Sequence, residues 1–443
     1  MRRGLLPQLS PPQLLVLVYG IGLLTGTGFF LLPIATADGR GLPVVDALFM
    51  AASALCVTGL AVVDPGSALS RLGHVVLITL VQIGGLGFMS IATFMAILLG
   101  KRISIRDRKI LKESLNHHSI DGTMTLVSTI VASAVIVQGF GAIVLSQVFT
   151  RYMPTGDAYF YGFFHAVSAF NNAGFDLFGN SLGNFQHEII LQLTVICLFV
   201  IGGLGFLVLL NIVQERGRWQ RFSLHTKLVL SMTAILCVIG TLLLFLVEKD
   251  RPAFADLTLA EQLIASFFNS MATRSAGMNT IPLGLFHQST LLLFVLLMFV
   301  GSSPSSTGGG VKSITVATSF LMLVALFRGK REITVFRRTI ANAVVLRSFV
   351  VLVLALSAIF IATFVLTLTE QIPVFTALFE VISAFGTVGF SLSLTPQLTD
   401  IGKLTIVFMM TMGRLGPMTL FYALARRETP SYIRHPEEPI IIG

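Results

Sequence analysis

Four short glycine segments recur along the chain in a pattern suited to binding a bare metal cation. They read LCVTGL at 55–60, FNNAGF at 170–175, TRSAGM at 273–278 and FGTVGF at 385–390. Anchored on their glycines, the segments share an alanine five residues earlier and a phenylalanine ten residues earlier. Four copies of one helix-and-loop unit in a single chain can surround a common axis.

The chemistry that such an axis offers is coordination by backbone carbonyl oxygens. Carbonyls can replace the hydration shell of a monovalent cation without burying a full charge. Glycine tolerates the backbone angles that turn carbonyls inward, and four helix C-termini add partial negative charge. Because the side chains differ among the copies, we expect backbone coordination from Cys56, Val57, Thr58, Gly59, Asn171, Asn172, Ala173, Gly174, Arg274, Ser275, Ala276, Gly277, Gly386, Thr387, Val388 and Gly389.

Each glycine ends an apolar stretch that is too short to cross a bilayer. Helices are expected at 43–56, 157–171, 258–273 and 373–386. The part of each from 16 to 4 residues before its glycine reaches about 18 Å, against a hydrocarbon core of about 30 Å. Pro43 and Pro373 suit the first turn of two of them. The chain must therefore turn back inside the membrane, where irregular backbone has to line a cavity or be buried.

The composition predicts a membrane protein, because hydrophobic residues make up 54% and charged residues 12% of the 443. The fold class we expect is an all-α polytopic membrane protein with four span–re-entrant helix–span repeats around a central pore. The repeats occupy 1–111, 112–220, 221–330 and 331–425, followed by a C-terminal tail at 426–443. The eight spans are placed at 14–34, 71–99, 124–149, 187–213, 225–247, 288–327, 341–368 and 399–425.

Charge and cysteine content narrow the class of function. Most of the 30 lysines and arginines gather on one side of the predicted spans, which places that side and both termini in the cytoplasm. The net charge of +9 lies in short loops and does not indicate nucleic-acid binding. The three cysteines predict neither a disulfide framework nor a metal site, and no motif indicates an enzyme. Residues 104–118 could lie on acidic lipid as an amphipathic helix or form a docking surface.

The second span of each repeat carries a further glycine motif. IGGLGF occurs at 83–88 and again at 201–206, and GRLGP occurs at 413–417. Close helix packing through small residues and pore lining are both compatible with it. The third repeat instead has GSSPSSTGGGVK, which cannot continue as a helix and marks a substrate path. We expect a gate formed by Gly301, Ser302, Ser303, Pro304, Ser305, Ser306, Thr307, Gly308, Gly309, Gly310, Lys312 and Arg414.

The four-repeat layout, IGGLGF, GSSPSSTGGGVK and GRLGP together resemble the Trk/Ktr/HKT superfamily of potassium transporters over nearly the whole chain. The chain opens almost directly with the span of the first repeat and is expected to lack an extra N-terminal pair of spans. In this it resembles the membrane subunit of the Ktr system. The resemblance implies channel-like potassium uptake across the bacterial cytoplasmic membrane, with potassium as substrate, sodium as a candidate activator and no covalent cofactor. It also implies a homodimer on a cytosolic nucleotide-binding KtrA-type ring, with Arg274 facing away from the ion.

Three buried cations keep alternative interpretations open. Arg414 could raise the barrier to cations below the filter, or it could be structural, paired with a carboxylate or capping carbonyls. Lys312 could bind loop carbonyls or extend to the cytoplasmic surface. Arg274 is expected to make a buried pair behind the filter, with Glu380 of a neighbouring re-entrant helix as a candidate partner. The alternative function is an alternating-access transporter, but that class typically pairs inverted repeats, whereas these four share one orientation.

Overall fold

The computed structural model describes residues 11–87, 123–330 and 332–424. Within these ranges the chain is mainly helical, and the sheet there is one short hairpin, β1 (Thr334–Val335) with β2 (Arg338–Thr339). The expectation of an all-α fold is confirmed at this level. The expectations for residues 104–118 and for the tail at 426–443 fall outside the described ranges.

The helices fall into four consecutive sets. The first comprises α1 (Pro11–Leu31), α2 (Val44–Cys56), α3 (Pro65–Ala68) and α4 (Arg71–Leu86). The second comprises α7 (Thr123–Phe149), α8 (Thr155–Phe170), α9 (Ile189–Leu204) and α10 (Phe206–Gln214). The third comprises α11 (Leu224–Glu248), α12 (Leu259–Ala272), α13 (Gln288–Phe299) and α14 (Ser313–Phe327). The fourth comprises α15 (Asn342–Glu370), α16 (Val374–Gly386), α17 (Asp400–Leu415) and α18 (Pro417–Leu424). Short 3₁₀ turns lie at Pro33–Ala35, Gly183–Phe185, Trp219–Arg221, Pro252–Phe254, Leu283–Leu285 and Thr395–Gln397.

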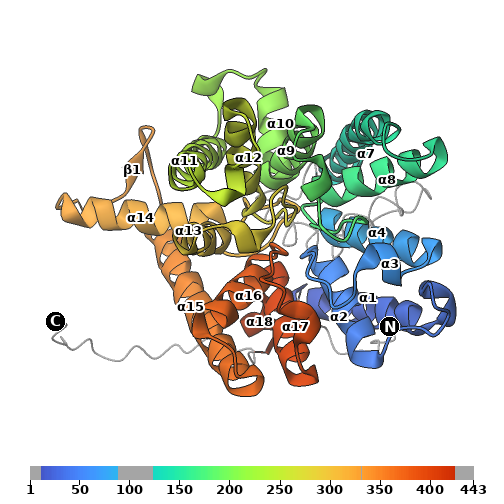
Figure 1. Ribbon diagram of the computed structural model, residues 1–443. Coiled ribbons are helices and arrows are strands. Elements are labelled where there is room, and N and C mark those ends of the chain that lie inside the picture. Colours follow the sequence, from blue (N-terminus) through green and yellow to red (C-terminus); the bar gives the residue numbers. More distant parts are fainter. Residues whose placement is uncertain (1–10, 88–122, 331, 425–443) are drawn as a thin grey trace.

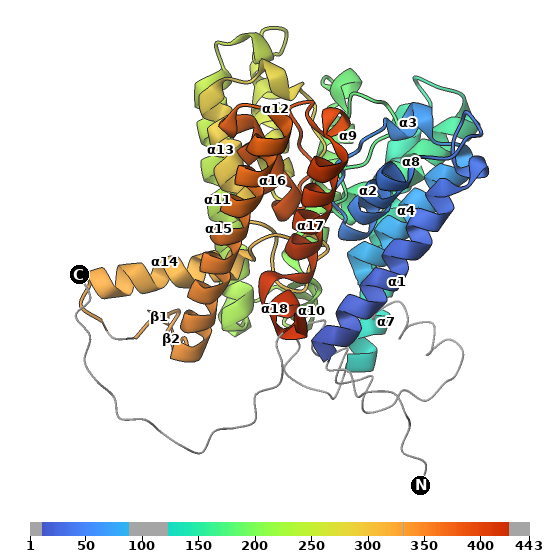
Figure 2. The ribbon, with the colours of Figure 1, turned by 90° about the horizontal axis from the view of Figure 1, so that it is seen from below.

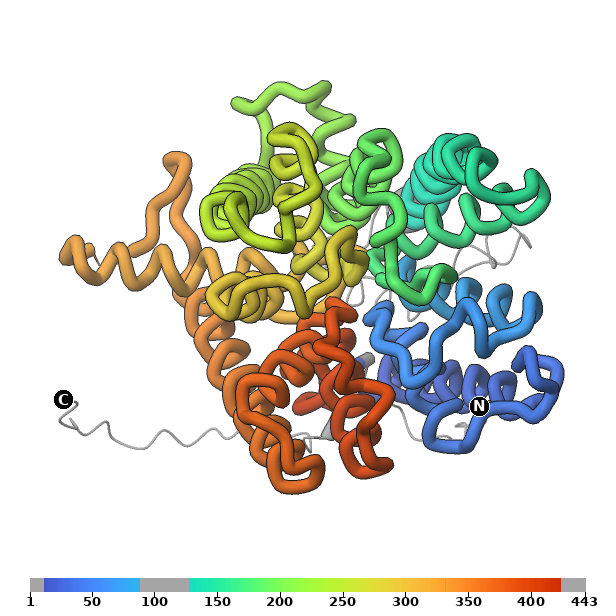
Figure 3. Tube along the Cα trace, viewed as in Figure 1, coloured from blue at the N-terminus to red at the C-terminus, as the bar shows by residue number. Residues whose placement is uncertain are grey.

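The four sets surround a common centre. In Figure 1 they occupy successive sectors in chain order, from α1 and α2 through α8 and α12 to α16 and α17. The tube in the same view shows loops from all four sectors meeting in the middle (Figure 3). The short helices α2, α8, α12 and α16 start and end within two residues of the re-entrant helices expected from the sequence.

Helices long and apolar enough to cross a membrane are present, but two expected spans are bent. Four described helices are long and apolar enough to cross a bilayer, at Pro12–Leu31, Val127–Phe149, Leu224–Glu248 and Asn342–Glu370. The spans expected at 187–213 and 399–425 each fall on a pair of helices, α9 with α10 and α17 with α18. The chain turns through 93° between α9 and α10 and through 97° between α17 and α18.

The bends follow from the last glycine of each motif. Gly87, Gly205 and Gly416 have φ values of 82°, 93° and 85° with ψ values of 128°, 136° and 140°. This backbone is open to glycine and costly for other residues, so the helix ends there. Three separate helices therefore stop in the same way at equivalent positions.

The third set is interrupted more severely, as the GSSPSSTGGGVK segment predicts. Helix α13 ends at Phe299 and α14 starts at Ser313. In Figure 2, α14 lies across the long helices instead of continuing the direction of α13. The intervening residues 300–312, called the intramembrane loop below, connect two helices of different direction.

Candidate ion-conducting site

The four glycine loops leave their helices with the same backbone conformation. Two residues before each glycine stands a non-glycine residue with a positive φ, namely Val57 (59°), Asn172 (59°), Ser275 (64°) and Thr387 (48°). The glycines have φ values of 88°, 72°, 67° and 97° in chain order. A left-handed conformation costs a β-branched residue about 1–2 kcal/mol, so the surroundings must impose it. Such strain is typical of functional sites.

The first, second and fourth loops share one hydrogen bond, and the third loop has a different one. The amide before the glycine donates to a serine carbonyl five residues earlier in Thr58–Ser53, Ala173–Ser168 and Val388–Ser383, each at 2.8 Å. In the third loop the glycine itself, Gly277, donates to Ala272 at 3.3 Å. Met271 replaces the serine in this copy, so the departure coincides with the one sequence mismatch.

The four glycines form a closed ring. A β-carbon on Gly59 would collide with the carbonyl oxygen of Ala173, and one on Gly389 with that of Thr58. A β-carbon on Gly174 would lie 2.8 Å from the Cα of Gly277, whose own β-carbon would meet the carbonyl oxygen of Val388. Each loop thus touches the next one around the ring at a distance that only glycine permits.

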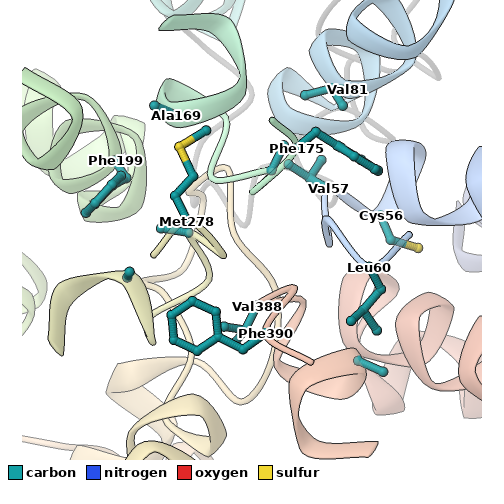
Figure 4. Packing of buried hydrophobic residues seen from close by; sticks show 14 of the residues in the cluster. Cys56, Val57, Leu60, Val81, Ala169, Phe175, Phe199, Met278, Val388 and Phe390 are labelled. Atoms are coloured by element: carbon teal, nitrogen blue, oxygen red, sulfur yellow. The ribbon is translucent and has the colours of Figure 1, made fainter. Parts of the chain in front are cut away.

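Large apolar side chains anchor the ring from behind. The residue after each glycine is at most 1% exposed, and these residues are Leu60, Phe175, Met278 and Phe390. Figure 4 shows them on four differently coloured ribbons around one centre. The ring of Phe390 also packs against that of Phe294, with centroids 5.8 Å apart. Burial of these side chains fixes each loop to the core, so the ring does not depend on the loops alone.

Glycines of the second motif support the loops from the other side. A β-carbon on Gly84, Gly202 or Gly413 would collide with the carbonyl oxygen of Leu55, Phe170 or Phe385, respectively. Each of these carbonyls lies four residues before a ring glycine. The equivalent Gly301 instead approaches Gly309 within the intramembrane loop. The first glycine of the motif therefore serves close packing under the ring, and the last one ends the helix.

The intramembrane loop lies directly against the ring and its supports. Its backbone amides at Ser303 and Thr307 donate to the carbonyls of Gly203 and Gly202, each at 3.2 Å. The amide of Gly310 donates to Gly413 at 3.1 Å. The amide of Gly309 donates at 2.9 Å to the hydroxyl of Thr387, which belongs to the fourth ring loop. The loop is thus bonded to both the second and the fourth helix sets.

Two cationic side chains bind this loop. The guanidinium of Arg414 donates to the carbonyl of Thr307 in the loop and to the carbonyls of Gly84 and Gly85 in the first set. The Nζ of Lys312 donates to the carbonyl of Gly308 at 2.7 Å. For Lys312, the loop-binding alternative is the one observed. Arg414 caps carbonyls, and one of them belongs to the loop itself.

A cavity of about 430 Å³ adjoins the loop and both cations. Its wall includes Tyr19 of α1, Gly87, Lys312, Arg414 and Gly416. At roughly 30 Å³ per water molecule, this volume has room for on the order of ten waters. The ring of glycine loops, the intramembrane loop with its two cationic side chains and the cavity thus adjoin one another.

The expected pair between Arg274 and Glu380 is wrong. The carboxylate of Glu380 accepts a hydrogen bond from Thr395, which follows the ring glycine of its own set. Arg274 is 8% exposed and lines a small cavity with Thr233 and Ser302, among other residues. Arg274, just after the end of α12, and Glu380 of α16 therefore contact different neighbours. The sequence reasoning also missed Tyr19, whose only signal was a hydroxyl in an apolar span.

Comparison with known proteins gives the class first. The sequence profile of the TrkH family, described as cation transport proteins, matches residues 22–433. The chain belongs to this TrkH family of cation transport proteins, and so to a family of multi-pass membrane proteins.

Individual relatives cover almost the entire chain. It is 38% identical over 435 residues to the Ktr system potassium uptake protein B of Bacillus subtilis (strain 168), spanning 98% of this chain and 97% of that protein. It is 38% identical over 450 residues to the potassium/sodium uptake protein NtpJ of Enterococcus hirae, spanning 100% and 99%. The crystal structure of TrkH from Vibrio parahaemolyticus matches with a TM-score of 0.75 at 19% identity, covering 96% of this chain and 87% of that one. The resemblance to the Trk/Ktr/HKT superfamily is confirmed.

Proposed function

We propose that this chain conducts potassium into bacterial cells through the ring of Gly59, Gly174, Gly277 and Gly389. The observation that carries the proposal is the close approach of each glycine to the next loop around a closed ring. The names of the similar proteins, which include potassium uptake and potassium/sodium uptake, support the choice of ion. The proposed architecture is eight spans and four pore loops in the cytoplasmic membrane, with both termini inside.

The ring would select a cation through its backbone. The helices α2, α8, α12 and α16 lead into the ring at their C-terminal ends, where the helix dipole is negative. Carbonyl oxygens of the sixteen loop residues named above replace water around the ion. Potassium is the substrate in this mechanism, and sodium remains a candidate activator.

The intramembrane loop would act as the gate. Its bonds to Gly202, Gly413 and Thr387 hold it against the ring, and Arg414 and Lys312 add positive charge at the same place. A cation leaving the ring meets this obstruction before it reaches the cavity. Opening requires the loop to release these bonds.

The proposed assembly is a homodimer on a cytosolic KtrA-type ring that binds nucleotides. Similarity to a protein whose name places it in a Ktr system supports a partner of this kind. The alternative of an alternating-access transporter gains no support from the geometry, since the four helix sets surround one centre in chain order (Figure 1).

The test is flux through purified protein in liposomes. Wild type should pass potassium in preference to sodium, and Gly174→Ser should lower that preference by about tenfold, or about 1.4 kcal/mol, because the added side chain meets Gly277. Gly139→Ser is the matched control, since a β-carbon at Gly139 meets nothing within 4 Å. Equal selectivity in wild type and Gly174→Ser would refute the proposal.

A further inference from the structure

The first and last helix sets meet without a direct chain connection. The other neighbouring sets follow one another along the chain, whereas the ring closes where α1 and α2 lie beside α17 and α18 (Figure 1). We call this interface the seam. Because no linker limits how far the first and last sets can separate, non-covalent contacts alone hold the ring closed there.

Polar contacts join the seam at three levels. Lys403 of α17 pairs with Asp46 of α2, with 2.5 Å between Nζ and Oδ1. The hydroxyl of Tyr19 on α1 lies 3.2 Å from the hydroxyl of Thr411 and 2.9 Å from the sulfur of Cys56. Near the N-terminal end of α1, the side-chain amide of Gln13 donates to the carbonyl of Ala423 at 3.3 Å.

Helix-dipole effects alone do not explain the position of Lys403 in the Lys403–Asp46 pair. Asp46 lies in the first turn of α2, where the helix dipole favours a carboxylate. Lys403 lies in the opening turn of α17, where the dipole disfavours a cation. Both side chains are largely buried, with exposed fractions of 13% and 17%. A buried cation in that position requires its carboxylate partner.

Consecutive sets carry weaker versions of the same contact. Arg71 of α4 pairs with Asp157 of α8, and His187 pairs with Glu261 of α12. The side chains of Arg71 and His187 are 56% and 55% exposed, so water screens these pairs. The most buried of the three pairs is therefore at the interface that has no covalent link.

We propose that Lys403, Asp46 and Tyr19 are positioning residues that hold α2 in the ring and thereby set the ion selectivity. The inference rests on the proposed function. Asp46 fixes the start of α2, and Tyr19 fixes its end at Cys56, the residue before the left-handed Val57. Movement of α2 at the seam would change the distance from Gly59 to the loops of Ala173 and Gly389.

The test compares seam variants with matched controls, using potassium-to-sodium flux ratio and melting temperature in the full-length protein. Lys403→Gln should lower the flux ratio about three- to tenfold. Lys403→Arg keeps a positive charge for the pair with Asp46 and should therefore leave the flux ratio close to that of the wild type. Arg71→Gln is the control at a covalently linked interface and should change the ratio less than about twofold. Equal losses in Lys403→Gln and Arg71→Gln would overturn the proposal.

Tyr19→Phe decides the matter if Lys403→Gln does not fold. It removes one hydroxyl and two contacts, and it should lower the flux ratio while Tyr159→Phe, at an exposed position on α8, leaves the ratio unchanged. A wild-type ratio in Tyr19→Phe would also overturn the proposal. The two proposals fail in different ways. If the proposed function is wrong, Gly174→Ser has wild-type selectivity. If only the seam proposal is wrong, the seam variants have wild-type selectivity while Gly174→Ser does not.

Discussion

At the scale of single residues, Arg414 joins two roles that the sequence presents as alternatives. Its guanidinium satisfies carbonyls of Gly84 and Gly85, which is a structural contact. It also binds Thr307 in the intramembrane loop, which places a positive charge beside the proposed pathway. Arginine suits both roles, because its planar group can donate several hydrogen bonds at once and stays charged.

We expect Arg414→Ala to raise potassium flux. A unit charge 4 Å from a passing cation costs about 4 kcal/mol at an effective dielectric of about 20, and water in the cavity reduces this to about 1–3 kcal/mol. The corresponding increase is roughly ten- to a hundredfold. Arg414→Lys keeps the charge and should largely keep the restriction. Flux and thermal stability are measured together, and an Ala variant with lower flux and lower stability would favour a purely structural arginine.

Glu261 gives a prediction about pH. Hydrogen bonds from Thr258 and then the contact with His187 lower the pKa of the Glu261 carboxyl to about 2. An unfolded glutamate titrates near about 4.3. The carboxylate therefore stabilises the fold above about pH 4.3, and this contribution is lost as the pH falls toward about 2.

The melting temperature of wild type should accordingly fall more steeply between pH 5 and pH 3 than that of Glu261→Gln, which lacks the titrating group. The two proteins are compared in the same detergent and at the same ionic strength. Parallel curves would show that Glu261 does not contribute in this range.

At the scale of elements, the helix-ending glycines of three sets correspond to the broken helix of the third set. Gly87, Gly205 and Gly416 end three helices with the same backbone conformation, and the intramembrane loop follows the corresponding helix of the third set. The loop then bonds to the glycine motifs of the second and fourth sets through Gly202 and Gly413. The same short motif thus supplies both the space for the loop and the carbonyls that hold it.

Deleting Ser305–Gly310 should raise the maximal potassium flux and weaken control by a cytosolic ring. The deletion removes the amides of Thr307, Gly309 and Gly310 that hold the loop in place, together with the Thr307 carbonyl that binds Arg414. Flux is measured in liposomes, with folding checked by melting temperature. A folded deletion protein whose flux stays at or below that of wild type would show that the loop is not a closed gate.

At the scale of the whole molecule, repetition made the sequence informative. The matched Gly, Ala and Phe positions predicted the helices α2, α8, α12 and α16, because a recurring pattern identifies equivalent segments without any single strong motif. The broken third span and a charge inside the last span, together with the family resemblance, instead indicated Lys312 and Arg414. The repeated pattern could not predict the bends at Gly205 and Gly416, since an apolar run shows length and not direction.

Contacts between distant segments were also beyond the sequence. The Arg274–Glu380 pair failed because complementary charge does not determine which neighbour a side chain faces. Thr411 and Lys403 of the last set contact Tyr19 and Asp46 of the first set, and only the closed ring brings these distant segments together. Tertiary arrangement, and not local pattern, determines such contacts.

The most direct measurement is diffraction from crystals grown with rubidium, a potassium analogue with a strong anomalous signal. The account predicts an anomalous peak on the axis between Gly59, Gly174, Gly277 and Gly389, within coordination distance of the loop carbonyls. Gly174→Ser should weaken or remove that peak, while Gly139→Ser should keep it. A peak elsewhere in the protein, with none inside the ring at saturating rubidium, would contradict the account.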